Sequence, residues 1–276
     1  MRIEFLLALA LFPAILSAQE LVTVKGRIIN EQGQSVEYVQ IGMPKREIGA
    51  ISTADGHFEI EVPCDTLEFF HVSYRKACFP VTSPADDVLI VLEGQELPPA
   101  VFIGGNAKEK YLIRPGSRAL NNLGIITTSP DGVHPKGREL GSVAKAKKPF
   151  LVKDILFSVL RNHIPGCVAS INIYRIEGKK ETFVDVLHKP IYFDVPVSDE
   201  QQSFVIQPEE TLLLEPGRYF IAFQIVGYDM QSTITPDMSM DFSIYLKSSY
   251  LREAALGEMK PFPVNIGIAV KGLEYQ

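Results

Sequence analysis

The sequence predicts an all-β protein built from two successive β-sandwiches. Two observations support this prediction: apolar and polar residues alternate with a period of two, and clusters of Gly, Pro, Asp and Ser separate short apolar segments. In the second sandwich only Leu251 to Met259 has a helical pattern. The chain of 276 residues has room for two modest domains, and 46% hydrophobic and 22% charged residues are an ordinary globular composition.

The first residues have the features of a secretory signal peptide. Arg2 precedes an apolar run from Phe5 to Leu16, which is shorter than the roughly 20 residues needed to span a bilayer. Ala18 supplies the small residue before the expected cut. We therefore expect residues 1–18 to be removed and the exported chain to begin at Gln19, with no transmembrane span.

Residues 19–93 are predicted to form the first sandwich. Apolar residues occupy alternate positions in Leu21 to Ile29 and again in His57 to Val62, as expected of strands with one buried face. Leu67 to Val72 and Val88 to Leu92 are apolar on both faces, which favours central strands. About seven short strands are expected, which is typical of a compact sandwich.

Four segments of this region follow one another in a characteristic order and spacing: Val24 to Gly33, Val39 to Ile41, Gly49 to Phe58 and Asp65 to Leu67. Together they resemble the carboxypeptidase regulatory-like domain, a transthyretin-like sandwich. Two positions depart from the family pattern: Ser35 stands where the family often has Pro, and Ser73-Tyr74 where it has Gly-Tyr.

The resemblance implies an accessory module rather than an active one. In this family the domain usually accompanies a peptidase, an outer-membrane receptor of the TonB-dependent type or another surface module. Metallo-carboxypeptidases place their zinc ligands in a separate catalytic domain with a His-x-x-Glu motif, and none of the five histidines here is followed by Glu at that spacing.

Residues 94–135 are predicted to be a linker with short ordered pieces. Proline and glycine interrupt any long element there, as in Leu97-Pro98-Pro99 and Pro130-Asp131-Gly132. We interpret Asn106 to Leu112 as a helical turn or two that Arg114-Pro115 ends, because a residue before proline disfavours the α region.

Residues 136–276 are predicted to form a second, larger sandwich of jelly-roll type. About eight to ten strands in two sheets that bury one face each against the other would account for the pattern. The clearest strands are Phe150 to Leu160, Val168 to Ile176, Phe183 to Leu187, Arg218 to Val226, Asp241 to Leu246 and Val264 to Val270.

The second half carries a further resemblance. Gly137 to Gly141, Ile171 to Tyr174 and Gly217 to Ile221 look like parts of the uncharacterised β-sandwich that accompanies the first domain in exported bacterial proteins. This resemblance implies architecture and no particular activity.

The three cysteines fit neither a disulfide-dense scaffold nor a zinc site, because closely spaced Cys/His pairs are missing. Cys64 and Cys78 are the candidate disulfide, since both are expected near strand ends in one small domain. The alternative is that these two and Cys167 are three buried thiols.

No pattern predicts a catalytic, cofactor-binding or metal site. Gly33-Gln34-Ser35-Val36-Glu37 comes closest to the Gly-x-Ser-x-Gly nucleophile motif, but Glu37 replaces the second glycine and no strand-turn-helix is expected there. P-loop, dinucleotide-binding, His-Glu-x-x-His and EF-hand motifs are missing. His71 lies inside an apolar strand, and we interpret it as a core residue because metal ligands come in clusters. The chain is therefore predicted not to be an enzyme.

One basic cluster lies near the start of the second sandwich, although the net charge of −6 argues against broad affinity for nucleic acid. It is a candidate patch for an anionic glycan or lipid head group. The alternative is a solvated loop or a set of lysines that block strand pairing at a sheet edge. Its residues are Lys136, Arg138, Lys145, Lys147, Lys148 and Lys153.

These observations favour a non-catalytic interaction or assembly module of the cell envelope, in the periplasm or at the outer-membrane surface of a Gram-negative bacterium. Its expected partner is another envelope protein, and no cofactor is predicted. The alternative is a carbohydrate-binding protein that uses the second sandwich, although the chain has no Trp. The tyrosines considered for stacking on a sugar are Tyr174, Tyr192, Tyr219 and Tyr228.

Overall fold

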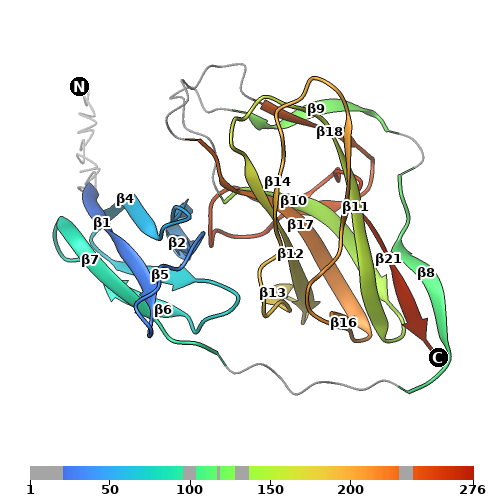
Figure 1. The fold of residues 1–276 in the computed structure, drawn as a ribbon, viewed down its shortest axis with the longest axis horizontal. Helices are drawn as coiled ribbons and strands as arrows, with labels where there is room; N and C mark the ends of the chain where they lie inside the picture. Colours follow the sequence, from blue (N-terminus) through green and yellow to red (C-terminus); the bar gives the residue numbers. More distant parts are fainter. Residues whose placement is uncertain (1–20, 96–103, 117–118, 128–136, 230–238) are drawn as a thin grey trace, which may run out of the picture.

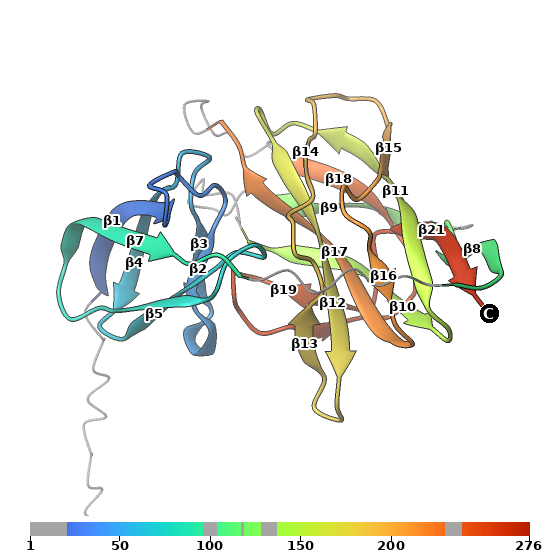
Figure 2. The ribbon, with the colours of Figure 1, turned by 60° about the horizontal axis from the view of Figure 1, so that its bottom comes forward.

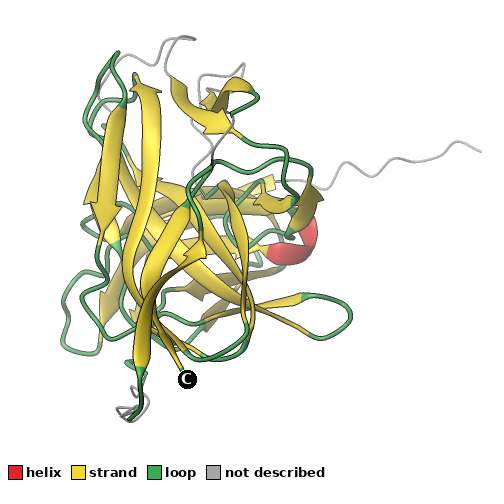
Figure 3. Ribbon diagram, turned by 90° about the vertical axis from the view of Figure 1, so that its right-hand side faces the viewer, coloured by secondary structure: helices red, strands yellow, loops and turns green. Residues whose placement is uncertain are grey.

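The computed structural model describes residues 21–95, 104–116, 119–127, 137–229 and 239–276. They form two β-sandwiches that lie side by side, the smaller at the left of Figure 1 and the larger at the right. The prediction of an all-β fold is confirmed: the described residues contain a single helical turn, Pro44–Arg46, shown in red in Figure 3. No helix in this part of the chain has the length and apolar character to cross a membrane. The predicted signal peptide lies outside the described residues.

The smaller sandwich packs a three-stranded sheet on a four-stranded sheet. The first has the order β4-β1-β7, with β1 antiparallel to β4 and parallel to β7. The second is antiparallel and has the order β3-β2-β5-β6. The strands are β1 (Leu21–Asn30), β2 (Gln40–Met43), β3 (Ile48–Ile51), β4 (His57–Pro63), β5 (Thr66–Phe70), β6 (Ala77–Pro80) and β7 (Ala85–Leu92).

Alternation in the sequence decides which face of each strand enters the core. Val24 and Ile28 of β1 are fully buried, whereas Lys25 and Arg27 between them are exposed. Full burial of one such aliphatic side chain contributes about 1.5–3 kcal/mol. The half-buried strands predicted from periodicity are therefore present, and the apolar face holds the two sheets together.

Strand β7 is an edge strand, in contrast to the central strand predicted for residues 88–92. Ile90 and Leu92 enter the core, but Leu89 is 58% and Val91 47% exposed. Within the described residues β1 pairs with one side of β7 and no strand pairs with the other. The prediction was wrong because an apolar run in the sequence looks the same whether both faces of the strand are covered or only one.

A β-bulge interrupts the pairing of β1 with β7. One residue lies between Val24 and Gly26, whereas two lie between their partners Ala85 and Val88. A Cβ atom on Gly26 would lie 2.1 Å from the Val88 carbonyl oxygen, so only glycine permits this close approach. Asp87 in the bulge adopts a φ of 60°, which is uncommon for a residue other than glycine.

The larger sandwich contains two seven-stranded sheets among the described residues. The β17 sheet has the order β13-β12-β17-β10-β19-β20, with β14 also paired to β12. Its strands are β10 (Glu139–Ala146), β12 (Val168–Glu177), β13 (Thr182–Asp185), β14 (Tyr192–Asp194), β17 (Gly217–Gly227), β19 (Ser249–Arg252) and β20 (Lys260–Phe262).

The β11 sheet has the order β8-β21-β11-β18-β9, and β15 and β16 also pair with β11. Its strands are β8 (Ala107–Ile113), β9 (Asn121–Thr127), β11 (Phe150–Asn162), β15 (Gln202–Ile206), β16 (Leu213–Leu214), β18 (Ser239–Ile244) and β21 (Ala269–Tyr275). The aromatic side chains of both sheets meet in the core: the Phe223 ring of β17 lies 5.7 Å from Phe157 of β11 and 5.0 Å from Phe242 of β18.

Three predictions for this half are corrected by the structure. Residues 107–113 and 121–127, predicted to lie in a linker, are the edge strands β8 and β9, and β8 replaces the predicted helical turn because it pairs with β21. Residues 251–259, predicted to be helical, contain the end of β19 and a turn. The last strand begins at Ala269, after the predicted Val264.

The two sandwiches meet along a seam built around one small side chain. Ala255, in the loop between β19 and β20, is fully buried. Cβ atoms on Gly42 of β2 and Gly49 of β3 would lie 2.8 Å and 2.3 Å from the Ala255 carbonyl oxygen, and one on Gly137 would lie 2.5 Å from its amide nitrogen. Because these three residues have no Cβ atom, the loop that contains Ala255 can pack closely against β2 and β3 of the smaller sandwich.

Polar and aromatic contacts extend the seam on both sides of Ala255. Lys260 of β20 forms a 2.6 Å ion pair with Glu47 of the smaller sandwich. The Tyr38 and Tyr192 rings meet edge-to-face at 5.0 Å, and the Tyr192 hydroxyl lies 3.4 Å from His71 Nε2. The sandwiches are therefore joined by specific packing.

Candidate functional site

A groove of about 630 Å³ lies on the smaller sandwich, where the bulge separates β7 from β1. It combines charged side chains of both signs with the exposed Leu89. Its lining residues are Lys25, Gly26, Arg27, Ile51, Thr53, His57, Phe58, Glu59, Asp86, Asp87, Val88 and Leu89. Its lining includes the first half of β7, the teal strand at the left of Figure 1, which pairs with β1 on one side and with no strand on the other among the described residues.

Two ion pairs lie in and beside this groove. Lys25 Nζ lies 2.9 Å from Glu59 Oε1, and the Glu59 carboxylate raises the Lys25 pKa. His57 Nδ1 lies 3.0 Å from Asp55 Oδ2. Hydrogen bonds from Thr53 and from His57 lower the Asp55 pKa to about 2.

A buried polar cluster lies under the outer face of the β17 sheet. Antiparallel register places Glu139 of β10 opposite Arg252 of β19. Glu139 is fully buried, and its Oε1 accepts hydrogen bonds from Asn172 (2.8 Å), Tyr174 (2.8 Å) and Arg252 (3.3 Å). The Arg252 guanidinium also lies 5.3 Å from the centre of the Tyr174 ring. A buried charge is thus paired and held by hydrogen bonds.

Three polar atoms of this region are buried without a hydrogen-bond partner among the described residues: Glu139 Oε2, Asp185 Oδ2 and Arg252 Nε. Each such atom costs about 1–3 kcal/mol. Burial raises the pKa of Asp185 to about 7, with the Glu139 charge acting in the same direction. This cluster was not predicted, because its members lie on strands far apart in the sequence.

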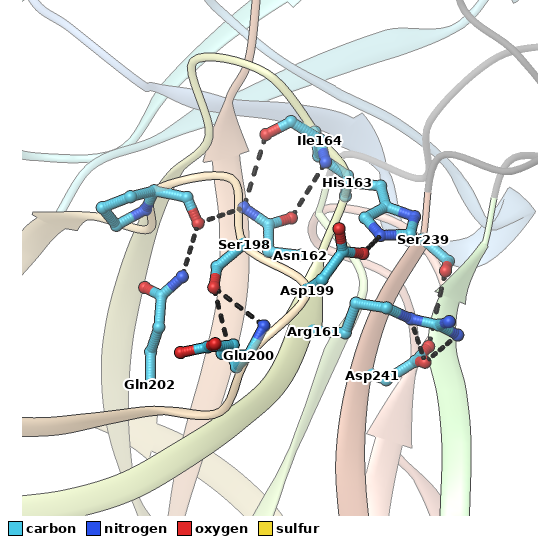
Figure 4. A network of polar contacts seen from close by, with 11 residues as sticks. Arg161, Asn162, His163, Ile164, Ser198, Asp199, Glu200, Gln202, Ser239 and Asp241 are labelled. Atoms are coloured by element: carbon cyan, nitrogen blue, oxygen red, sulfur yellow. Dashed lines mark hydrogen bonds and ion pairs between the residues drawn. The ribbon is translucent and has the colours of Figure 1, made fainter.

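A second polar network holds the loop before β15 against the end of β11 (Figure 4). The fully buried Asn162 donates its side-chain amide to the carbonyl oxygens of Val195 (2.8 Å) and Pro196 (3.2 Å). Its Oδ1 accepts the Ile164 amide proton at 3.0 Å. One asparagine therefore satisfies several backbone groups of an irregular segment.

The same network contains a histidine-carboxylate pair, His163 Nε2 to Asp199 Oδ1 at 2.7 Å (Figure 4). In the same network Ser198 donates to the Glu200 carbonyl oxygen (3.0 Å), and Ser239 donates to the Asp241 carboxylate (3.4 Å). These contacts hold the loop against the end of β11. Among the described residues no group of three or more His, Cys, Asp or Glu is placed to hold a metal ion.

The structure does not bring the predicted basic cluster together. Lys136 lies outside the described residues. Arg138 precedes β10 and forms a 2.8 Å ion pair with Glu253, whereas Lys145 lies near the other end of that strand. Lys153 belongs to β11, in the opposite sheet. The other two, Lys147 and Lys148, are exposed in the turn between β10 and β11.

The four tyrosines considered as sugar platforms lie in the core or the seam. Tyr174 and Tyr219 are 3% and 1% exposed. Tyr192 faces Tyr38 and His71 in the seam, and Tyr228 is partly buried against the main core. These rings offer no open stacking face of the kind that the alternative function requires.

The cysteines are free in the structure, and the candidate bridge between Cys64 and Cys78 is not formed. The β5–β6 register explains this, because it places Cys78 opposite Glu68, whereas Cys64 precedes β5. Both residues are exposed, whereas Cys167 is buried. Burial, with a smaller contribution from the Asp194 charge, raises the pKa of the Cys167 thiol to about 12.

Two thiols of the native chain are expected to react with an aromatic disulfide reagent at pH 8, and the third only after unfolding. Cys64 and Cys78 are exposed, but Cys167 is protected by burial and by its raised pKa. The number of thiolates released per chain measures this directly. Cys64→Ser and Cys78→Ser should each remove one fast-reacting thiol, and a native protein without fast-reacting thiols would contradict the assignment.

Comparisons with solved structures give neighbours of low identity and low TM-score. A DUF3823 family protein from Parabacteroides merdae is 10% identical, covering 89% of this chain and 97% of its own, with a TM-score of 0.23. A DUF3823 family protein from Bacteroides ovatus is 8% identical, with 81% and 96% coverage and a TM-score of 0.23. A structure of infectious bursal disease virus is 11% identical, with 92% and 63% coverage and a TM-score of 0.27.

No family model matches the chain. No curated protein matches it either. At these identities and TM-scores the similar structures transfer no ligand or activity to this chain.

Proposed function

We propose that this chain is a non-catalytic interaction module of the bacterial cell envelope, which binds a partner protein along the free edge of β7 and the adjoining groove. In this proposal the smaller sandwich is a carboxypeptidase regulatory-like domain and the larger one is of jelly-roll type. The signal-peptide pattern of residues 1–18 supports export to the periplasm or the outer-membrane surface.

The observation that carries the proposal is the exposed apolar edge of β7. Leu89 and Val91 project from the outer face of an edge strand at 58% and 47% exposure. Natural proteins protect such edges with charges or bulges, because unpaired strands recruit other strands. Asp86 and Asp87 provide both devices at the start of β7, but the residues from Val88 onward carry neither. A partner that adds an extended segment there would gain backbone hydrogen bonds and bury both side chains.

Placing positive charges on the exposed face of β7 is expected to weaken binding of the partner protein. Tagged mature protein would be captured from crosslinked envelope and its partners quantified by mass spectrometry. The double variant Leu89→Lys/Val91→Lys should reduce a reproducible partner by about tenfold or more, because two buried aliphatic side chains contribute roughly 1.5–3 kcal/mol each. Both sites are exposed, so the fold should persist.

Val205→Lys is the matched control, since Val205 is 59% exposed but lies on β15 of the larger sandwich. A partner retained by this control and lost by the double variant supports the proposal. A capture profile that is the same in all three proteins, or the absence of any reproducible partner, contradicts it.

A further inference from the structure

A cleft of about 430 Å³ lies on the larger sandwich, between the β12–β13 hairpin and the β19–β20 segment. Its size is within the range of small-molecule sites. Figure 2 shows the hairpin projecting beyond its sheet at the lower edge of the molecule. The lining residues are Lys180, Glu181, Phe183, Tyr250, Arg252, Gly257, Glu258, Met259 and Pro261.

The carboxylate of Glu181 is fixed in this cleft. Arg218 Nη1 donates to one of its oxygens and the Tyr250 hydroxyl to the other, both at 2.7 Å. The Arg218 hydrogen bond and then the Tyr250 hydrogen bond lower the Glu181 pKa, so the group stays ionised. Glu181 and Leu256 have φ values of 54° and 60°, and backbone strain of this kind concentrates at ligand sites. The acceptor is thus oriented before any ligand arrives.

An apolar wall stands beside this acceptor. The Phe183 and Tyr250 rings meet edge-to-face at 4.8 Å, and Phe220 supports Tyr250 from behind at 5.8 Å. Met259 and Pro261 continue the apolar lining. The cleft therefore offers a ligand two kinds of contact: hydrogen bonds to the Glu181 carboxylate, and an apolar surface on which C–H groups can pack.

The charges of the cleft balance. Arg218 neutralises Glu181, and the buried Glu139 neutralises Arg252 at 3.3 Å. The remaining two lining charges, Lys180 and Glu258, are of opposite sign. A cleft without net charge does not favour an anion or a cation, whereas its separate donors and acceptors suit a ligand whose groups both donate and accept.

We propose that this cleft binds a neutral sugar residue, whose C–H face packs against the apolar wall and whose hydroxyls donate to Glu181 and accept from Lys180 and Arg252. This proposal goes beyond the protein-binding edge of β7 and does not depend on it, because the two surfaces lie on different sandwiches. Variants of one surface leave the other intact, so either proposal can fail alone.

The test uses the full mature chain and the methyl glycosides of glucose, galactose, mannose and N-acetylglucosamine. Saturation-transfer NMR and calorimetry should detect binding of at least one of them. Glu181→Gln should weaken that binding on the order of tenfold or more, because hydrogen bonds to charged groups are the stronger ones. Lys180→Gln, at an exposed position of the same turn, should weaken it as well.

Glu177→Gln is the matched control: it lies on the same hairpin, pairs with Arg175 at 3.4 Å and does not line the cleft. Binding lost in Glu181→Gln and Lys180→Gln but kept in Glu177→Gln supports the site. The proposal is overturned if no glycoside binds at tens of millimolar, or if both cleft variants bind like the wild type. Tighter binding of methyl glucuronide than of methyl glucoside would also overturn it, because the site would then select an anion.

Discussion

Replacement of Arg252 by methionine is expected to lower the free energy of unfolding by roughly 3–5 kcal/mol. The Arg252 guanidinium lies 3.3 Å from Glu139, which is fully buried in the β17 sheet. Without the guanidinium the Glu139 carboxylate keeps only neutral hydrogen-bond donors, and a buried charge without a counter-ion is strongly destabilising. Methionine fills much of the same volume, so the loss reports charge rather than a cavity. Urea denaturation at pH 7 measures it.

Two further variants separate the charge effect from a general effect of losing an arginine. Arg175→Met removes an exposed partner of Glu177 in the same sheet and should cost less than about 1 kcal/mol. Adding Glu139→Gln to Arg252→Met should recover a large part of the stability, since the unpaired charge is then gone. A double variant as unstable as Arg252→Met alone would disprove this account of the cluster.

Acidification is expected to act on His71 and Asp185 in opposite directions. Burial lowers the His71 pKa from 6.5 to about 4, so its contribution to stability is complete above pH 6.5 and is lost as the pH falls through 4. Burial raises the Asp185 pKa from 3.8 to about 7, so its contribution is complete below pH 3.8 and is lost as the pH rises through 7. At about 1.4 kcal/mol per pKa unit, each amounts to roughly 3–4 kcal/mol. The two largely offset each other in the wild type.

Single variants should reveal the two opposing slopes. With His71→Gln only the Asp185 dependence remains, and the free energy of unfolding should rise by a few kcal/mol as the pH is lowered from 7 to 4. With Asp185→Asn it should fall by a similar amount from pH 6.5 to pH 4. Urea titrations across this range measure both slopes. The wild-type protein, in which the two slopes largely offset each other, is the reference. Parallel profiles for the His71 and Asp185 variants would refute the assignment.

The parts of the fold that could be predicted are those in which one face of a strand is buried and the other is not. The alternation in β1 and β4 placed both strands within a residue or two of their observed bounds. Strand β8 was missed because Lys108, Glu109 and Lys110 carry no strand pattern. Only its pairing with β21 makes that segment extended, and such pairing is a long-range effect.

Local helix propensity misled the prediction after β19. The segment from Glu253 to Leu256 is rich in helix formers, yet it forms a turn because Ala255 is held against Gly42 and Gly49. The contact joins residues that are more than 200 positions apart in the sequence, so no local rule contains it. The same seam explains why the polar residue Gln40 is buried.

The candidate sites were harder to predict than the fold. Leu89 and Val91 belong to an apolar run that reads as fully buried, and only the strand order shows that one face is open. Glu181 lies in the turn between β12 and β13, whereas Arg218 lies on β17, and the two meet because β12 pairs with β17. Spacing in the sequence carries no signal for such a pair.

The loop between β19 and β20 belongs to the seam and to the sugar-sized cleft at once. Ala255 packs against the smaller sandwich, and Gly257 and Glu258, which follow directly, line the cleft. Ligand binding and domain docking therefore act on one short stretch of backbone. Thermodynamic linkage is reciprocal: if packing of the two sandwiches changes the affinity of the cleft for its ligand by some factor, bound ligand changes the packing equilibrium by the same factor.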